Sequence, residues 1–305
     1  MELAWIILRQ TLLMSLYMLI GYLLYKGKKI DAAGSRSMAS MLVWVVIPAT
    51  VLKSCLVPYS AQRLTELAQC FLLAAAVLAL AMAVSRLCFQ KDPIAQFSGS
   101  FSNAGFIGIP LVQASLGDEA VFYLLGIIIL LNLLQWTYGA GLLKGEKTHL
   151  TLKMVLLNPV TVAAVAGLAV FTTGLGTGLP SICVNLVSGV AALNAPLAMI
   201  VLGVYLAQVN GKHMVTDQKL YLLSALRQVL IPCLTIPVIA LLPGTVSMKM
   251  TLMIAAAAPV GANVAVFCQL YDRDYAYACE TVTQSTVLSI LTLPLMTALA
   301  GLVIR

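Results

Sequence analysis

Two short stretches of this chain place amide side chains beside glycine and proline within strongly apolar sequence. The first reads SNAGFIGIPL over residues 102–111, and the second reads APVGANV over residues 258–264. The residues of interest are Asn103, Gly105, Gly108 and Pro110 in the first stretch and Pro259, Gly261 and Asn263 in the second. An amide nitrogen donates hydrogen bonds without carrying a charge, so these asparagines are suited to bind a carboxylate.

The glycines and prolines predict that the helices containing these two stretches are interrupted. Proline lacks an N–H donor and disrupts the hydrogen bond to the residue four positions back, and glycine lets the chain unwind. We expect Gly108 and Pro110 to hold the first helix open, and Pro259 with Gly261 the second. Interruptions that cross would bring together two helix N-termini, each with a partial positive charge, where an anion can bind. The alternative is close helix packing through small residues, with the asparagines as interhelical hydrogen-bonding groups.

The composition requires a membrane setting. Hydrophobic residues make up 61% of the 305 residues, charged residues make up 10%, and the mean hydropathy is +0.99, which excludes a soluble globule. Ten spans of the length that crosses a bilayer are predicted, at about 3–25, 39–57, 66–88, 95–116, 120–143, 154–173, 181–209, 218–242, 250–270 and 279–303. The first span lacks a basic leader and a cleavage pattern, so we expect a retained helix rather than a signal peptide.

Basic residues gather on alternate connections between these spans. They are Lys26, Lys28, Lys29, Arg36, Arg86, Lys91, Lys144, Lys147, Lys153, Lys212, Lys219 and Arg273. Because cytoplasmic connections carry an excess of Lys and Arg, this side is expected to face the cytoplasm, with both termini outside the inner membrane. The same bias, with attraction to anionic membrane lipid, explains the net charge of +7, so nucleic acid is not an expected partner.

Five spans followed by five spans predict an inverted repeat, because a unit with an odd number of spans inserts upside down the second time. The two units are residues 1–143 and 154–305. Helix-disturbing residues recur at matching serial positions, with Pro48 in the second span against Asn194 and Pro196 in the seventh. The two asparagine stretches fall in the fourth and ninth spans. The expected fold class is an all-α membrane protein of ten helices in which the fourth and ninth are broken and cross.

The stretch NAGFIGIPL from Asn103, together with the opening LRQTLLMSLYMLIGYLLYKGKKI and the later APVGANV, resembles the auxin efflux carrier family. That family includes plant PIN transporters and bacterial permeases labelled for malate or malonate. The resemblance extends over essentially the whole chain. It implies a ten-helix inverted-repeat fold similar to that of bile-acid sodium symporters.

The resemblance also implies a division of labour within the chain. The expected scaffold domain is about 1–57 plus 154–209, and the expected transport domain is about 66–143 plus 218–305. By matching position, the residues that would line the substrate site are Asn103, Pro110, Pro259 and Asn263. From the residues alone, the candidate substrate-binding set also contains Gly105, Gly108, Gly261, Asn194 and Arg227.

Arg9 lies inside the first predicted span, and Arg227 lies well inside the eighth. Charges within a membrane are costly and are functional candidates by default. Arg9 can extend to the outer surface, whereas Arg227 is deeper and is either part of the site or a partner for backbone carbonyls. The intramembrane glutamines are interpreted as interhelical hydrogen-bonding groups rather than ligands: Gln10, Gln135, Gln228 and Gln284.

Catalytic, cofactor and metal sites are not expected. The seven cysteines form no C-x-x-C pair, and His149 and His213 are interpreted as isolated, solvated loop residues. H-E-x-x-H, G-x-S-x-G and Walker motifs are missing, which argues against an enzyme and an ATP-driven pump. All eleven acidic residues fall at span ends or in connections, so a buried carboxylate pair for ion exchange is missing. Backbone carbonyls at the crossing could still hold sodium, so coupling to sodium or protons stays open.

These patterns favour a secondary transporter that moves small organic anions, carboxylates, by alternating access between two domains. The alternative is a transporter-like membrane receptor or sensor without net transport, although no output domain accompanies the ten spans. The sequence leaves open whether the chain forms a homodimer.

Overall fold

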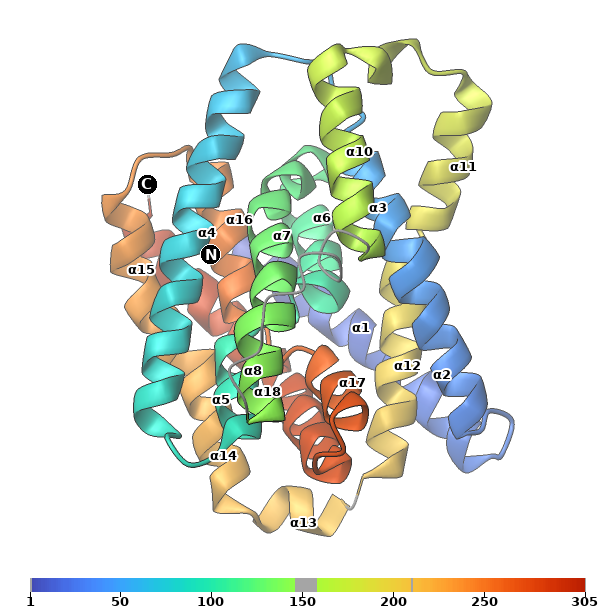
Figure 1. The fold of residues 1–305 in the computed structure, drawn as a ribbon, viewed down its shortest axis with the longest axis vertical. Coiled ribbons are helices and arrows are strands. Elements are labelled where there is room, and N and C mark those ends of the chain that lie inside the picture. Colours follow the sequence, from blue (N-terminus) through green and yellow to red (C-terminus); the bar gives the residue numbers. More distant parts are fainter. Residues whose placement is uncertain (1, 146–157, 210, 305) are drawn as a thin grey trace.

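The computed structural model describes residues 2–145, 158–209 and 211–304, and all regular secondary structure in them is helical (Figure 1). An isolated antiparallel bridge joins Ser102 to Val260. The described part contains seven helical runs that are long and apolar enough to cross a membrane: Glu2–Lys26, Ala32–Ser54, Ala61–Cys88, Asp118–Lys144, Ser181–Gln208, Gln218–Leu241 and Tyr275–Val303. Three shorter apolar helices are Ala104–Leu116, Pro159–Thr173 and Val246–Ala257. The chain is therefore an α-helical membrane protein that crosses the bilayer several times.

The elements follow one another with short connections. Up to residue 145 they are α1 (Glu2–Lys26), α2 (Ala32–Met41), η1 (Leu42–Val46), α3 (Ile47–Ser54), α4 (Ala61–Cys88), α5 (Pro93–Ser100), η2 (Ala104–Gly108), α6 (Ile109–Leu116), η3 (Asp118–Tyr123), α7 (Leu124–Leu134), η4 (Gln135–Gly139) and α8 (Ala140–Lys144). From residue 158 they are α10 (Pro159–Thr173), η5 (Leu175–Gly178), α11 (Ser181–Ala191), α12 (Asn194–Gln208), α13 (Gly211–Thr216), α14 (Gln218–Ala225), η6 (Leu226–Leu230), α15 (Ile231–Leu241), α16 (Val246–Ala257), α17 (Asn263–Leu270) and α18 (Tyr275–Val303).

Side-chain caps set where several helices begin. Ser60 accepts a hydrogen bond from the main-chain N–H of Arg63 at the start of α4, and Asp274 does the same for Tyr277 at the start of α18. Such caps satisfy donors that have no partner within the helix. Both helices therefore start several residues before the predicted spans at about 66 and 279, because polar capping residues extend them beyond the apolar run.

Three π-helical turns end two residues before a proline: η1 before Pro48, η2 before Pro110 and η6 before Pro232. Proline offers no N–H and clashes with the carbonyl four residues back. A π turn contains one extra residue, which gives that carbonyl room without ending the helix. The helix therefore continues through each of these prolines.

Glycines allow α1 and α12 to approach each other closely. A Cβ atom on Gly21 would lie 2.0 Å from the carbonyl oxygen of Ile200, and one on Gly203 would lie 1.9 Å from that of Met18. In Figure 1, α2, α3, α10, α11 and α12 lie together on one side, and α4, α15 and α16 lie on the other. Between these groups lie α5, α7 and α17. The cavity described below lies between elements of the first group and the middle elements α7 and α17.

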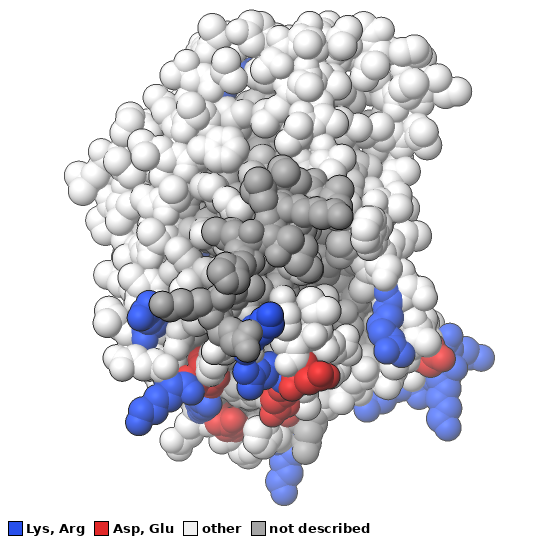
Figure 2. Space-filling view, in the orientation of Figure 1, with Lys and Arg blue, Asp and Glu red and all other residues white. Residues whose placement is uncertain are grey.

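Charged side chains gather toward one end of the face shown in Figure 2, the end at which α13 lies. Two ion pairs mark the end at which α3 finishes and α4 begins. Lys53 pairs with Asp118 at 3.3 Å, and Arg63 pairs with Glu119 at 3.1 Å. On this face, the described surface above the charged end is mostly uncharged, as expected where a protein faces lipid.

Candidate functional site

Two non-helical stretches, residues 101–103 and 258–262, pair with each other and are called the crossover below. The first separates α5 from η2, and the second separates α16 from α17. The main-chain N–H of Asn103 donates to the carbonyl of Pro259 at 2.8 Å, and that of Gly261 donates to the carbonyl of Phe101 at 2.9 Å. This pairing satisfies main-chain groups that have left their helices, as an apolar environment requires.

The first interruption does not lie at Gly108 and Pro110, where the sequence placed it. The chain is helical without a gap from Ala104 to Leu116, and Pro110 sits in the first turn of α6. The π turn η2 provides the room that this proline needs, so Pro110 does not open the helix. The interruption lies instead at 101–103, where Asn103 starts the new helix by capping it.

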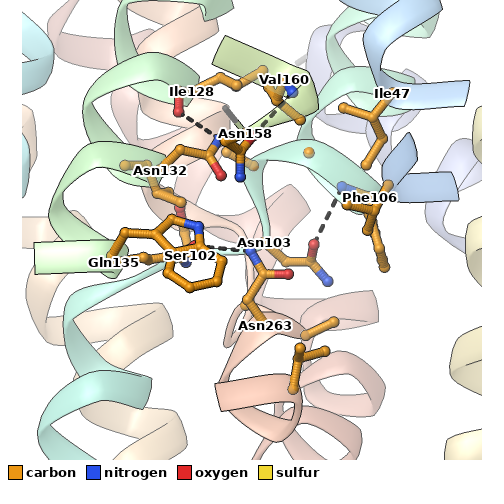
Figure 3. Close-up of a pocket in the computed structure, with 18 of the residues that line it drawn as sticks. Ile47, Ser102, Asn103, Phe106, Ile128, Asn132, Gln135, Asn158, Val160 and Asn263 are labelled. Atoms are coloured by element: carbon orange, nitrogen blue, oxygen red, sulfur yellow. Dashed lines mark hydrogen bonds between the residues drawn. The ribbon is translucent and has the colours of Figure 1, made fainter. Parts of the chain in front are cut away.

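A cavity of about 130 Å³ lies beside the crossover (Figure 3). Its walls come from η1 and α3, the crossover, η2, α7, η4 and the starts of α10 and α17. The polar side chains that line it are Ser102, Asn103, Asn132, Gln135, Asn158 and Asn263. Apolar side chains complete it, among them Ile47, Phe106, Trp136 and Phe267. No Lys, Arg, Asp or Glu is found among the described residues of the lining.

Hydrogen bonds fix the orientation of two amides in this cavity. The Oδ1 atom of Asn103 accepts from the main-chain N–H of Phe106 at 3.2 Å, and the Oε1 atom of Gln135 accepts from Asn263 Nδ2 at 2.8 Å. The oxygens of Asn103 and Gln135 accept these hydrogen bonds, so each of the two amides keeps an NH₂ group that can donate. Neither Asn103 Nδ2 nor Gln135 Nε2 has a partner in the described structure. Buried donors are rarely left unpaired, and a group that accepts hydrogen bonds would satisfy these two.

The structure brings four of the predicted site residues to the cavity lining: Asn103, Gly105, Gly261 and Asn263. Asn194 lies behind the lining, where its Nδ2 atom donates to the carbonyl of Gly105 at 3.4 Å. Pro259 contributes through its carbonyl, which accepts the bond from Asn103. Gly108 and Pro110 do not line the cavity.

Arg227 also lies away from the cavity. Its side chain is 2% exposed and donates to the carbonyls of Gly99 at 2.9 Å and Ala258 at 3.4 Å, and to that of Ala256. These carbonyls stand at the ends of α5 and α16. Of the two roles considered from the sequence, this geometry is that of a partner for backbone carbonyls.

Three further lining residues were not among the predicted site residues, and a fourth had been given another role. Gln135 was interpreted as an interhelical hydrogen-bonding group, and Ser102, Asn132 and Asn158 were not singled out. Asn132 and Gln135 are three residues apart, so they share one face of the helical run. That spacing of two amides within an apolar span is a signal that could have identified the pair.

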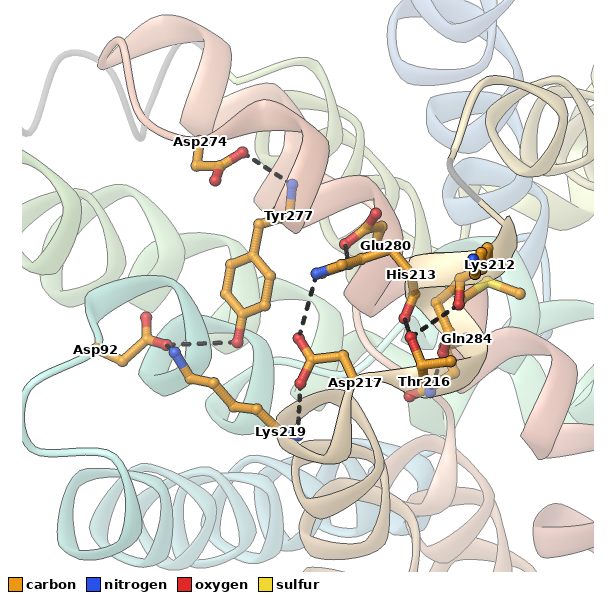
Figure 4. Close-up of polar contacts among 11 residues, drawn as sticks. Asp92, Lys212, His213, Thr216, Asp217, Lys219, Asp274, Tyr277, Glu280 and Gln284 are labelled. Atoms are coloured by element: carbon orange, nitrogen blue, oxygen red, sulfur yellow. Dashed lines mark hydrogen bonds and ion pairs between the residues drawn. The ribbon is translucent and has the colours of Figure 1, made fainter.

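His213 is not an isolated loop residue, which corrects the expectation from the sequence. It lies in α13, and its Nδ1 atom is 2.9 Å from Glu280 Oε2, while Nε2 is 4.0 Å from Asp217 (Figure 4). Nearby, Lys219 pairs with Asp92 at 2.5 Å. His149 lies outside the described residues, and within them no cluster of three or more His, Cys, Asp or Glu residues could hold a metal ion.

Comparison with known proteins shows which family the chain belongs to. No curated protein matches it significantly. The family model described as "Membrane transport protein" matches twice, over residues 6–154 and again over residues 148–297, so nearly the whole chain is covered. This is the family that the sequence resemblance indicated, with the auxin efflux carriers among its members. The chain belongs to this family of membrane transport proteins.

Proposed function

We propose that the chain is a secondary transporter that moves small organic anions bearing a carboxylate across the cytoplasmic membrane. One observation carries this proposal: Asn103 and Gln135 line the same cavity, and each has a buried amide nitrogen, Nδ2 or Nε2, that has no hydrogen-bond partner in the described structure. An ionised carboxylate offers acceptors and no donors, so it can satisfy both nitrogens at once. Hydrogen bonds to a charged group are also stronger than those between neutral groups.

Helix ends add a favourable field for an anion. The helical run that starts at Ala104 and α17, which starts at Asn263, both begin at the cavity. Each N-terminus carries about half a positive charge, so together they approach one elementary charge. This supports a substrate with one negative charge at the site. The apolar walls from Phe106 and Trp136 support an organic body attached to the carboxylate.

The architecture that we propose has ten spans. In it, α5 with α6 and α16 with α17 each form one interrupted span, and α10 forms a shorter one. The two family-model matches meet near residue 150, where the two proposed units meet. The inverted orientation of the second unit would follow from the odd number of spans. The scaffold domain would be about 1–57 plus 154–209 and the transport domain about 66–143 plus 218–305.

The location of the cavity supports alternating access. Val43 and Ile47 in the proposed scaffold domain face the crossover, α7 and η4 in the proposed transport domain across the cavity. A movement of one domain against the other would therefore change which side of the membrane reaches the site.

The test is a counterflow assay in proteoliposomes that contain the purified chain. Labelled mono- and dicarboxylates are screened with and without sodium and pH gradients, and organic amines of similar size serve as controls. We expect exchange of a carboxylate and no exchange of the amines. A receptor or sensor would bind a carboxylate without exchanging it, and uptake of amines alone would contradict the anion site.

A further inference from the structure

Arg227 joins the C-terminal ends of the two interrupted helices. Its guanidinium donates through Nη1 to the carbonyl of Gly99 in the last turn of α5. Through Nη2 and Nε it donates to the carbonyls of Ala256 and Ala258, at the end of α16 and in its cap. One side chain thus donates hydrogen bonds to the C-terminal ends of two helices that are distant in the sequence.

The charges at this point balance without any further ion. Each helix C-terminus carries about half a negative charge, so the ends of α5 and α16 together amount to about one elementary charge. The guanidinium supplies one positive charge, and within the described residues Arg227 forms no ion pair with a carboxylate. A buried cation must be compensated, and here main-chain carbonyls provide the compensation.

The surrounding residues hold this arginine in place. It lies in the π turn η6, and so does the next residue, Gln228. The side chain of Gln228 donates to the carbonyl of Ser285 and accepts from the hydroxyl of Thr292 at 2.7 Å, and both of these residues belong to α18. On the other side, a Cβ atom on Gly99 would lie 2.5 Å from Ser85 Oγ, so α5 approaches closely here. Arg227 is therefore bonded to α5 and α16, and the next residue, Gln228, is bonded to α18.

We infer that Arg227 supplies the positive charge that balances the C-terminal helix ends at the crossover. It is a positioning residue. Its guanidinium occupies the position where, without it, the carbonyl oxygens at the broken helix ends would hold a metal ion. Its charge stabilises the C-terminal ends on one side of the crossover, and this holds the two N-terminal ends in position at the cavity on the other. The inference deepens the proposed function, because it assigns the charge balance of the same site to a side chain.

The inference predicts that removal of the side chain creates a site for an added cation. Arg227→Ala should lower the melting temperature of the purified protein by about 5 °C or more, since three buried carbonyls lose their donors. Millimolar methylguanidinium should restore much of that loss, whereas tetramethylammonium, which has no N–H donor, should not. Arg86→Ala, at an exposed arginine in the last turn of α4, is the matched control and should show no response to methylguanidinium.

Two further variants separate charge from packing in case Arg227→Ala does not fold. Arg227→Lys keeps the charge and should retain carboxylate binding within about tenfold of wild type, whereas Arg227→Met keeps the length and should lose more. Equal behaviour of the Lys and Met variants would overturn the inference.

The wild-type protein provides the remaining arm, which needs neither a variant nor a known substrate. Its melting temperature should be the same in sodium, potassium and choline chloride at one ionic strength. A dose-dependent rise with sodium would overturn the inference, because a crossover that Arg227 already balances should gain no stability from a metal ion. If no carboxylate is exchanged in proteoliposomes, the proposed substrate fails, while the melting measurements still decide the role of Arg227.

Discussion

Asn263 donates its side-chain amide to Gln135 Oε1 at 2.8 Å, across 128 residues of sequence. The bond joins α17 to η4 and fixes both amides in one orientation. Because Gln135 uses its oxygen for this bond, its NH₂ group has no partner in the described structure, and the residue lines the cavity. The two residues therefore form one unit, in which Asn263 orients the donor that Gln135 offers.

Replacement of Gln135 should weaken carboxylate binding strongly. Gln135→Leu removes one donor and leaves Asn263 without its acceptor, so affinity should fall about tenfold to a hundredfold, from about 1.5–3 kcal/mol for a bond to a charged group. Titration calorimetry on the purified protein measures the change. Gln208→Leu is the control, because that amide is exposed and bonds within its own helix. Wild-type affinity in Gln135→Leu would contradict the donor role.

Asn103 has two functions that different substitutions separate. Asn103→Asp keeps the oxygen that accepts from the main-chain N–H of Phe106 but loses the NH₂ group and adds a buried negative charge, so anion binding should be lost while the cap remains. Asn103→Ala loses the cap as well, and the free energy of unfolding should fall by about 1 kcal/mol. Thermal unfolding and ligand titration on both variants measure the two effects. If the Asp variant still binds the carboxylate, the NH₂ group is not a ligand.

Native cysteines can test the proposed orientation. Cys88, at the end of α4, and Cys183, at the start of α11, are exposed, whereas the remaining cysteines are buried or partly buried. With both termini outside, a membrane-impermeant maleimide should label Cys183 in intact cells and Cys88 only after permeabilisation. Cys88→Ser and Cys183→Ser identify each signal. Labelling of Cys88 from outside would reverse the orientation.

Much of the helical layout could be predicted from the sequence, because long apolar runs leave few alternatives in a membrane. The predicted span 218–242, for example, coincides closely with Gln218–Leu241. The start of α4 was missed by five residues, since a polar first turn held by the Ser60 cap does not resemble an apolar run. Predictions from hydropathy are weakest at such capped ends.

The site was less accessible to sequence reasoning, because its contacts join distant elements. The sequence predicts the first interruption too far along the chain, because a proline within an apolar span indicates a break at Pro110. The π turn that accommodates this proline has no clear sequence signal. The partners of Arg227 depend on where α5 and α16 end, and no local pattern reports that. Asn103 and Asn263 could be found because an amide within an apolar span is unusual by itself.

Two cavity glycines, Gly261 and Gly105, offer a matched pair for testing the crossover. A Cβ atom on Gly261 would lie 3.1 Å from the carbonyl oxygen of Ser102 and 3.2 Å from that of Phe101, so alanine would press on the paired main chain. A Cβ atom on Gly105 would have its nearest neighbour, Ile47 Cδ1, at 3.9 Å. The two substitutions add the same methyl group to the same cavity under different constraints.

Gly261→Ala should therefore lower the free energy of unfolding by about 1–3 kcal/mol, because it strains the bond from Gly261 to Phe101. Gly105→Ala should leave stability level or raise it, since alanine is about 1 kcal/mol better than glycine within a helix. Its methyl group occupies cavity space, so the affinity for the bulkiest accepted carboxylate should fall while that for the smallest stays unchanged. Thermal unfolding and a titration series over carboxylates of increasing size measure both effects. Equal stability of the two variants would mean that the close main-chain approach at Gly261 does not hold the crossover together.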